Sequence, residues 1–203
     1  MRIIGSLFVI CILAGVSLGQ QPIDGVDARS NSAEFAKQLG STDPLLRQRS
    51  AEALARLAAV EHRKLVEGYQ LQEKNKDVRL ALNWALYRMG RSDALYSIVH
   101  DLDSGRQEQA IGYLSELESP NLLYPFLKKT TNPPRVRAGV LKALARIGDA
   151  TTLELVKPFR DSTEPYVAEA AEIAHDEIEK RLNEPPSPTR VRPRTVGSTG
   201  DRP

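Results

Sequence analysis

The chain has 203 residues and a net charge of +2, from 28 lysines and arginines against 26 aspartates and glutamates. Hydrophobic residues make up 41% and charged residues 27%, which excludes a wholly disordered chain, a collagen and a polytopic membrane protein. The single cysteine excludes a disulfide scaffold and a four-cysteine zinc site.

Residues 1–19 have the pattern of a secretory signal peptide. Arg2 supplies one positive charge, residues 3–16 are almost wholly apolar, and Ser17 and Gly19 place small side chains three and one positions before a cut. This apolar run is short for a membrane span, which needs about 20 residues. We therefore expect cleavage after Gly19, a secreted or periplasmic protein and no stable membrane insertion. A retained N-terminal anchor is the alternative.

Residues 20–42 are expected to form an N-terminal segment with one short capping helix. Asn31 and Glu34 have the spacing of a capping box, and Gly40 is a suitable end for the helix. We expect this helix to cover the N-terminal end of the repeats that follow.

Residues 43–183 repeat themselves at intervals of about 30 residues. Seven positions of one stretch align with seven of another at a fixed offset, and most match in type: Val78-Arg79, Leu82, Ala85-Leu86 and Met89-Gly90 against Val136-Arg137, Val140, Ala143-Leu144 and Ile147-Gly148. The same frame places unit origins at residues 46, 78, 106, 136 and 167. Spacings of 28 to 32 residues suit two short antiparallel helices per unit.

Each unit is predicted to begin with an amphipathic helix, because its apolar positions fall in a stripe roughly 100° wide. A second apolar set, 17 and 20 positions after each origin, predicts a second helix packed against the first. Its members are Leu95, Leu123 and Leu153, with Val66, Ile98, Phe126 and Val156. Asp43, Ser119 and Asn132 each precede a proline and are expected to cap helices, whereas Gly90 and Gly148 are expected to adopt the left-handed conformation after helices.

These motifs resemble HEAT repeats, particularly the short kind also seen in phycobilisome lyases. The resemblance covers residues 43–183 and implies an all-α solenoid of about five antiparallel helix pairs. Unit three departs from the pattern at Tyr113, where alanine is usual. We expect Tyr113 to widen that seam and bend the stack, and Trp84 to pack on the neighbouring unit.

Two sets of polar side chains recur in the frame. Arg47, Arg79 and Arg137 share one position at the edge of the apolar stripe, and we expect them to tie successive repeats together. In HEAT-like stacks the second helices line the concave face, so exposed residues there are candidate binding residues. They are Tyr96, His100, Tyr124, Lys128 and Glu154, with the two tyrosines expected to form one aromatic strip. The alternative is that both rings pack over the seams between units.

The sequence contains no catalytic motif, and we expect no cofactor. His62, His100 and His175 occupy different positions of the repeat frame, and none is followed by glutamate. The paired His-Glu steps that bind iron in the HEAT repeats of deoxyhypusine hydroxylases are therefore missing. Glu172 and His175 could share a metal, but a second such pair is lacking, so no metal site is expected.

Residues 184–203 are predicted to be a disordered tail rich in proline and arginine, either a solubilising extension or a second docking segment. Arg2 contributes one of the net charges and residues 183–203 two, which leaves the body at −1. A near-neutral body argues against nucleic-acid binding. We expect an exported, non-catalytic scaffold that binds a protein or peptide on its concave face. The alternative is a lyase-like maturation factor or enzyme that holds a cofactor in the groove.

Overall fold

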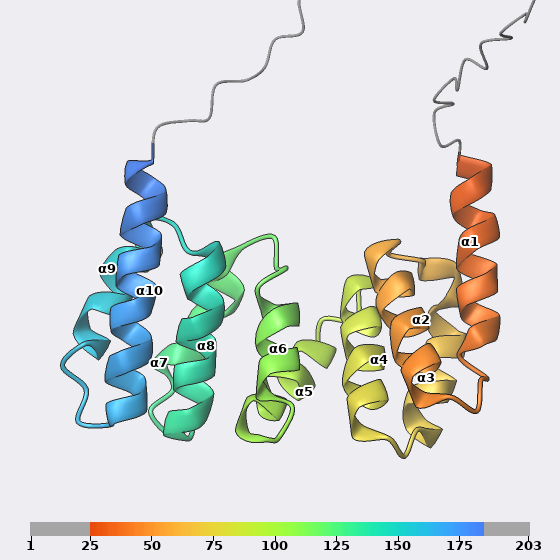
Figure 1. Cartoon of the computed structure of the whole chain (residues 1–203), viewed down its shortest axis with the longest axis horizontal. Coiled ribbons are helices and arrows are strands. Elements are labelled where there is room, and N and C mark those ends of the chain that lie inside the picture. The colour runs from red at the N-terminus through yellow and green to blue at the C-terminus, as the bar shows by residue number, and fades with distance from the viewer. Residues whose placement is uncertain (1–24, 185–203) are drawn as a thin grey trace, which may run out of the picture.

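The computed structural model describes residues 25–184, which form ten α-helices, four 3-10 turns and no strand (Figure 1). The α-helices are α1 (Gly25–Gln38), α2 (Pro44–Arg56), α3 (Arg63–Gln72), α4 (Lys76–Arg88), α5 (Ala94–His100), α6 (Gln107–Leu114), α7 (Tyr124–Lys128), α8 (Pro134–Ile147), α9 (Ala150–Val156) and α10 (Pro165–Asn183). The 3-10 turns are η1 (Val60–His62), η2 (Asp101–Asp103), η3 (Pro120–Leu122) and η4 (Lys157–Phe159).

The helices form an all-α solenoid, as the repeats predict. α2 with α3, α4 with α5, α6 with α7 and α8 with α9 are the pairs, and in Figure 1 the first helix of each pair lies in front of the second. The fifth unit contributes α10 alone within the described residues, and α1 packs on α2 at the opposite end. The described stack is therefore four pairs between two single helices.

One continuous core runs through the stack, from Leu39 to Ala174. It forms because the apolar stripes of the first helices are covered by second helices and by neighbouring first helices, as where α4 packs on α2, α3 and α5. In α4, for example, Val78, Leu82 and Leu86 are each at most 1% exposed. Complete burial of such a side chain contributes about 1.5–3 kcal/mol.

Several predicted caps are confirmed. The Asp43 carboxylate accepts a hydrogen bond from the Leu45 amide at 3.0 Å, with Pro44 in the first turn of α2. Ser119 accepts from the Asn121 amide at the start of η3. Gly90 has φ +92°, a left-handed conformation that glycine adopts without steric cost. Local capping chemistry therefore fixes these boundaries as the sequence indicates.

Three local predictions are wrong. Asn31 lies inside α1, which begins at Gly25, so it caps no helix. The Asn132 amide instead donates to the Phe126 carbonyl at 2.7 Å, satisfying the end of α7. Gly148 has φ −64°, so it does not adopt the left-handed conformation. A glycine is needed there because a Cβ would lie 2.6 Å from Ile178 Cδ1.

The seam between units two and three is wider than the others, as the presence of Tyr113 predicts. The rings of Trp84 on α4 and Tyr113 on α6 are stacked, with their centroids 5.5 Å apart and an angle of 1° between their planes. Two aromatic rings therefore lie between α4 and α6, and these helices approach one another less closely than α2 approaches α4 or α8 approaches α10 (Figure 1). Trp84 thus packs on the neighbouring unit, as expected.

The Tyr113 hydroxyl adds a contact across the seam. It donates a hydrogen bond to Glu52 Oε1 on α2 at 2.6 Å and accepts one from the Gln109 amide at 2.8 Å. Burial raises the pKa of Tyr113 well above its usual range, so the hydroxyl keeps its proton and remains a donor. This bond joins α6 to α2 past the intervening α4.

Candidate functional site

The candidate site is a groove along the wide seam, between α5 and α7 on the second-helix side. Its main part has a volume of about 1020 Å³. The lining residues used below are Tyr96, Val99 and His100 from α5, Asp103 from η2, Leu122 from η3, and Phe126, Lys129 and Pro133 from the α7–α8 region. Because two units splay apart here, the groove is a direct result of the seam geometry.

Aromatic side chains form the middle of the groove. Tyr96 is 68% exposed, and its ring meets the edge of the Phe126 ring at 5.2 Å between centroids and 70° between planes. Leu122, 40% exposed, lies on the neighbouring wall. An exposed tyrosine over a second ring is a rigid apolar surface with a polar hydroxyl, which suits recognition at little cost in side-chain entropy.

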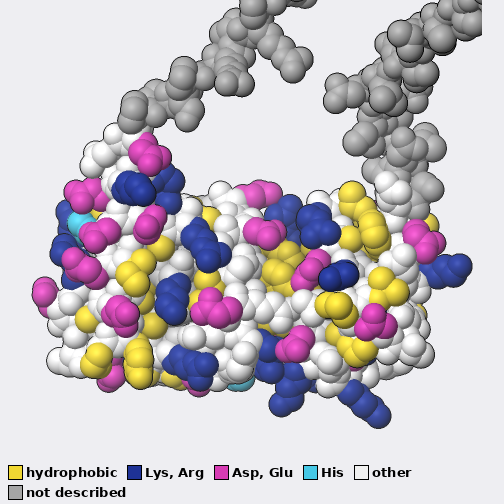
Figure 2. Space-filling view, viewed as in Figure 1, with side chains coloured by type: hydrophobic (Ala, Val, Ile, Leu, Met, Phe, Trp, Pro, Cys, Tyr) yellow, Lys and Arg dark blue, Asp and Glu magenta, His cyan; other side chains and the backbone are white. Residues whose placement is uncertain are grey.

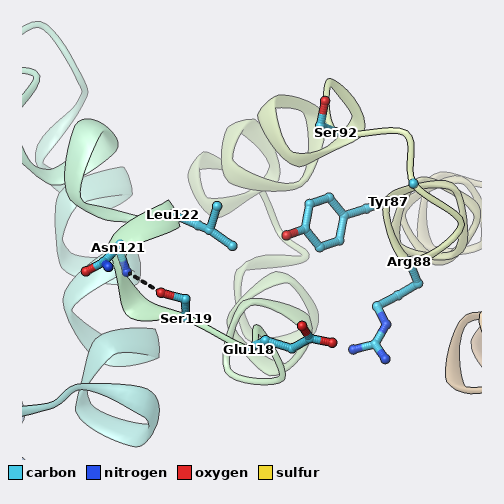
Figure 3. A pocket seen from close by; sticks show the side chains of 8 residues that line it. Tyr87, Arg88, Ser92, Glu118, Ser119, Asn121 and Leu122 are labelled. Atoms are coloured by element: carbon cyan, nitrogen blue, oxygen red, sulfur yellow. Dashed lines mark hydrogen bonds between the residues drawn. The ribbon is translucent and has the colours of Figure 1, made fainter.

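The groove continues around the upper edge of the stack. A second hollow of about 420 Å³ shares Ser92, Asn121 and Leu122 with the first and extends to Tyr87, Arg88 and Glu118. Figure 3 shows the Tyr87 ring facing into this hollow, with the Glu118 carboxylate and the Arg88 guanidinium turned toward each other. Burial, and secondarily the Glu118 charge, raise the pKa of Tyr87, so its hydroxyl remains protonated at neutral pH.

Polar groups lie at the lower end of the groove. The side chains of His100, Asp103 and Lys129 are exposed there, and none of these side chains makes a hydrogen bond or ion pair with another described residue. The Asn132 amide, in contrast, is engaged with the Phe126 carbonyl and holds the wall in place. The groove thus has an apolar middle with charged groups of both signs at its two ends.

The structure brings together two of the five predicted binding residues. Tyr96 and His100 line the groove, whereas Tyr124, Lys128 and Glu154 do not. The Tyr124 hydroxyl is hydrogen-bonded to Thr152 Oγ1 at 2.7 Å, so its ring packs over the next seam as the alternative interpretation predicted. Lys128 is exposed, and Glu154 pairs with Lys157 at 2.6 Å.

Phe126, rather than Tyr124, completes the aromatic surface with Tyr96. Its sequence position belongs to the core set of the repeat, where valine or isoleucine stands in the other units. A phenyl ring is larger than those side chains, and here it is only partly buried, so one edge reaches the groove. A phenylalanine at a core position that holds smaller side chains in the other units was the feature of the sequence that could have indicated this exposure.

The three repeat-frame arginines lie in three different environments. Arg47 makes a bidentate pair with Glu73 at 2.8 and 2.9 Å and also donates to the carbonyl of Ser41. It therefore ties the start of α2 to the junction of α3 and α4, and the Arg47 guanidinium lowers the pKa of the Glu73 carboxyl. Arg79 is exposed and Arg137 half-buried, and neither pairs with a carboxylate among residues 25–184.

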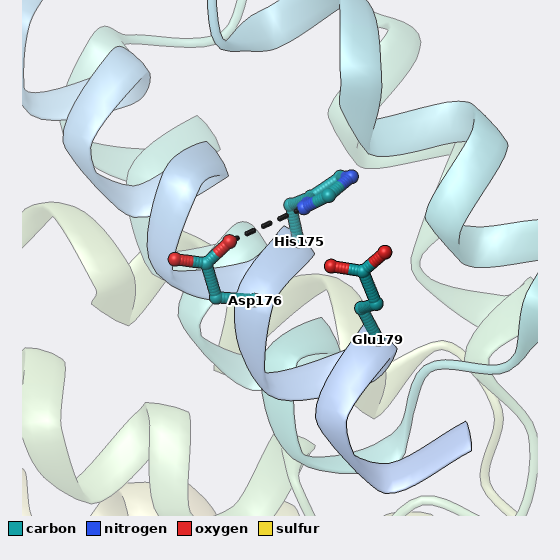
Figure 4. A group of neighbouring side chains, drawn as sticks. All are labelled: His175, Asp176 and Glu179. Carbon is teal, nitrogen blue, oxygen red and sulfur yellow. Dashed lines mark hydrogen bonds and ion pairs between the residues drawn. The ribbon is translucent and has the colours of Figure 1, made fainter. Parts of the chain in front are cut away.

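A group of potential metal ligands lies on α10. Atoms of His175, Asp176 and Glu179 come within 4.8 Å of one another, and His175 Nδ1 is 3.3 Å from Asp176 Oδ1 (Figure 4). The two carboxylates are exposed, and all three residues belong to one helix. Glu172, the other candidate partner of His175, is engaged in a bidentate pair with Arg160. This arrangement by itself does not define a metal site.

The face formed by the first helices carries shallow hollows rather than a single groove. Two of about 520 and 490 Å³ lie between α6, α8 and α10 and share Lys142 and Ile173. Figure 2 shows hydrophobic side chains there among lysines, arginines and acidic residues, with no continuous patch of one charge. Within the described part of the chain, no helix is long and apolar enough to cross a membrane.

The fold and site together define a HEAT-like helical-repeat protein with an open groove at one seam. No family model and no curated protein matches the chain. Human deoxyhypusine hydroxylase, solved in complex with glycerol, is similar at 18% identity over 76% of this chain and 75% of that chain, with a TM-score of 0.35. An engineered protein is similar at 22% identity over 76% and 81%, with a TM-score of 0.36. Likeness at this level says nothing about chemistry.

Proposed function

We propose that this protein is a non-catalytic scaffold that binds a protein partner by taking an extended segment of that partner into the seam groove. The observation that carries the proposal is the continuous groove itself, with an exposed Tyr96 ring supported by Phe126. Exposed aromatic rings in concave surfaces are the usual anchors of protein recognition, because they bury a large area while losing few rotamers.

The dimensions and chemistry of the groove favour an extended peptide. α5 has seven residues and is therefore about 10 Å long, and the upper hollow adds to this length. At about 3.3 Å per residue, five or six extended residues would fill the groove. Apolar side chains would contact Tyr96 and Leu122, while charged groups would meet Glu118 above and Asp103 or Lys129 below.

The side chains of the groove support binding rather than catalysis. His100 is the only lining histidine among the described residues, and no carboxylate or hydroxyl there is hydrogen-bonded to it. A general base must be oriented toward the proton that it removes, usually by a second hydrogen bond. An unoriented, solvent-exposed imidazole instead offers one polar contact to a bound peptide.

Export is part of this proposal and rests on the sequence of residues 1–19, which lie outside the described residues. The short apolar run after Arg2 and the small residues at 17 and 19 support a cleaved leader. Expression in a host with a secretory pathway, followed by N-terminal sequencing of the exported protein, tests it. A mature chain beginning at Gln20 is expected, and an intact N-terminus would contradict cleavage.

A peptide panel displayed on phage and selected against the full chain tests the binding function. Selected peptides are expected to lose at least tenfold in affinity for Tyr96→Ala, which is about 1.4 kcal/mol, typical of a buried aromatic anchor. Tyr166→Ala is the matched control, because Tyr166 is 74% exposed on α10 and lies outside the groove. Equal loss in both variants, or a bound small molecule in place of any peptide, would overturn the proposal.

A further inference from the structure

The groove opens at the edge of the stack where the C-terminal tail leaves it. The loops at its upper end follow α4 and α6, and α10 runs in the same direction as these helices and extends beyond that edge (Figure 1). Arg181 donates to the Ala145 and Gly148 carbonyls, which holds the end of α10 beside the end of α8. Glu184, the last described residue, therefore lies on the same side of the stack as the mouth of the groove.

We propose that the tail of the chain is a tethered ligand of its own seam groove, with Val191 and Pro193 on the Tyr96–Leu122 surface. This inference rests on the proposed function of the groove as a peptide site. The segment reads Arg190-Val191-Arg192-Pro193-Arg194, so apolar and basic residues alternate. In an extended chain alternate side chains point to opposite sides, so the apolar pair would face the rings while the arginines face the rim.

The length of the tail is sufficient for this contact. α8 and α6 lie between α10 and the seam, and packed helices are about 8–10 Å apart, so the path is about 20–30 Å. An extended chain covers about 3.3–3.6 Å per residue, so Val191, seven residues after Glu184, reaches about 25 Å. Nearly full extension of residues 185–190 thus brings the alternating segment within reach of the seam, and a less extended tail would place later residues there.

The charges of the rim complement the tail. Glu118, Asp93 and Asp103 lie along the groove, against the two cations Arg88 and Lys129. Asp93 pairs only with Arg91, at 3.2 Å and with its side chain 67% exposed, and such surface pairs are weak enough to be exchanged. Three arginines on alternate positions of the tail can pair with these carboxylates, and each such contact is charge-assisted.

Tethering would make even a weak contact effective. A segment joined by a short linker has an effective concentration in the millimolar range, so the tail would occupy the groove without high affinity. A partner would then have to displace the tail. The tail's occupancy of the groove would lower the apparent affinity of every competing ligand, so only tightly binding partners would be captured. The tail would thereby set the affinity threshold of the scaffold.

Paramagnetic relaxation in the full chain tests the proposal. Cys11 is the only cysteine, so a Cys11→Ser, Ser198→Cys chain takes one spin label on the tail, outside the contact segment. We expect the amide signals of Tyr96 and Leu122 to lose at least threefold more intensity than those of Leu182 and Ile173. The latter two are exposed at the C-terminal end and in the middle of α10, so a tail that does not dock would broaden them at least as strongly as the groove.

A variant with Val191→Ser and Pro193→Ser supplies the control. Broadening in the groove should fall to the level of Ile173 in this variant, and in the parent chain it should not change on tenfold dilution. Equal broadening at all four sites, or no effect of the double substitution, would overturn the proposal. Broadening that disappears on dilution would place the contact between two copies and would overturn it as well.

The peptide panel separates this inference from the proposed function. If both hold, selected peptides bind the Val191→Ser, Pro193→Ser chain at least threefold more tightly than the parent, because the tethered competitor is weakened. Equal affinities for the two chains refute the tail contact and leave the peptide site standing. No peptide binding to either chain refutes the peptide site and therefore the tail contact too.

Discussion

Removing the Tyr113 hydroxyl is the sharpest test of how the wide seam is held. Tyr113→Phe keeps the ring stacked on Trp84 and deletes the 2.6 Å hydrogen bond to Glu52 Oε1. Tyr113 is 7% exposed, and a hydrogen bond to a charged group contributes about 1.5–3 kcal/mol. Glu52 is only half-buried and keeps its bond from the Gln48 amide, so the lower end of that range, about 1.5 kcal/mol, is expected.

Thermal unfolding followed by circular dichroism measures this loss. For a domain of this size each kcal/mol lowers Tm by about 2–4 °C, so Tyr113→Phe should lower it by about 3–6 °C. Tyr87→Phe is the matched control, because the Tyr87 hydroxyl makes no hydrogen bond with the described residues, and it should change stability by less than about 0.5 kcal/mol.

A double-mutant cycle isolates the bond itself. In a Glu52→Ala background the hydroxyl has lost its charged acceptor, so Tyr113→Phe should cost less than about 0.5 kcal/mol. If Tyr113→Phe costs no more than Tyr87→Phe in the parent chain, or the same with and without Glu52, then the seam is held by ring stacking alone. The reasoning about the bridge would then be refuted.

Two other predictions concern stability. Gly148→Ala should cost about 1–3 kcal/mol in urea unfolding, because the new Cβ would lie 2.6 Å from Ile178 Cδ1 and 2.7 Å from the Leu144 carbonyl oxygen. Gly68→Ala on α3, where nothing lies within 4 Å, should instead stabilise by about 0.5–1 kcal/mol, and a loss there would contradict the packing account. Glu73→Gln should lower stability at pH 7 and flatten its pH dependence between about pH 5 and 3, measured by urea unfolding at each pH. The hydrogen bond from Arg47 lowers the folded-state pKa of Glu73 below its usual value. The stabilisation is therefore present above the unfolded-state pKa and is lost as the pH falls through the folded value, and an unchanged slope would argue against it.

The fold follows from the sequence because its signals are local and repeated. The apolar stripe of each first helix depends on residues within three turns, and the same pattern recurs in four or five units. Capping at Asp43 and the positive φ at Gly90 are local as well. Gly148 could not be assigned correctly, because part of its need for space comes from Ile178, thirty residues away.

The site was only partly predictable for a similar physical reason. The repeat frame shows that Tyr96 and Tyr124 occupy equivalent positions, but it does not show the width of each seam. At the wide seam Tyr96 remains exposed over Phe126, whereas at the next seam the Tyr124 hydroxyl finds Thr152. Equivalent positions therefore have different environments, and only the packing between units distinguishes them.

The bond from Tyr113 to Glu52 joins residues 61 positions apart and reaches past one whole unit. In repeat proteins each unit ordinarily contacts only its neighbours, so units can be duplicated or removed during evolution without disturbing the rest. Here one hydrogen bond also joins the third unit directly to the first. Gains and losses of repeats should therefore be confined to the C-terminal side of α6, and homologues of different length should differ there.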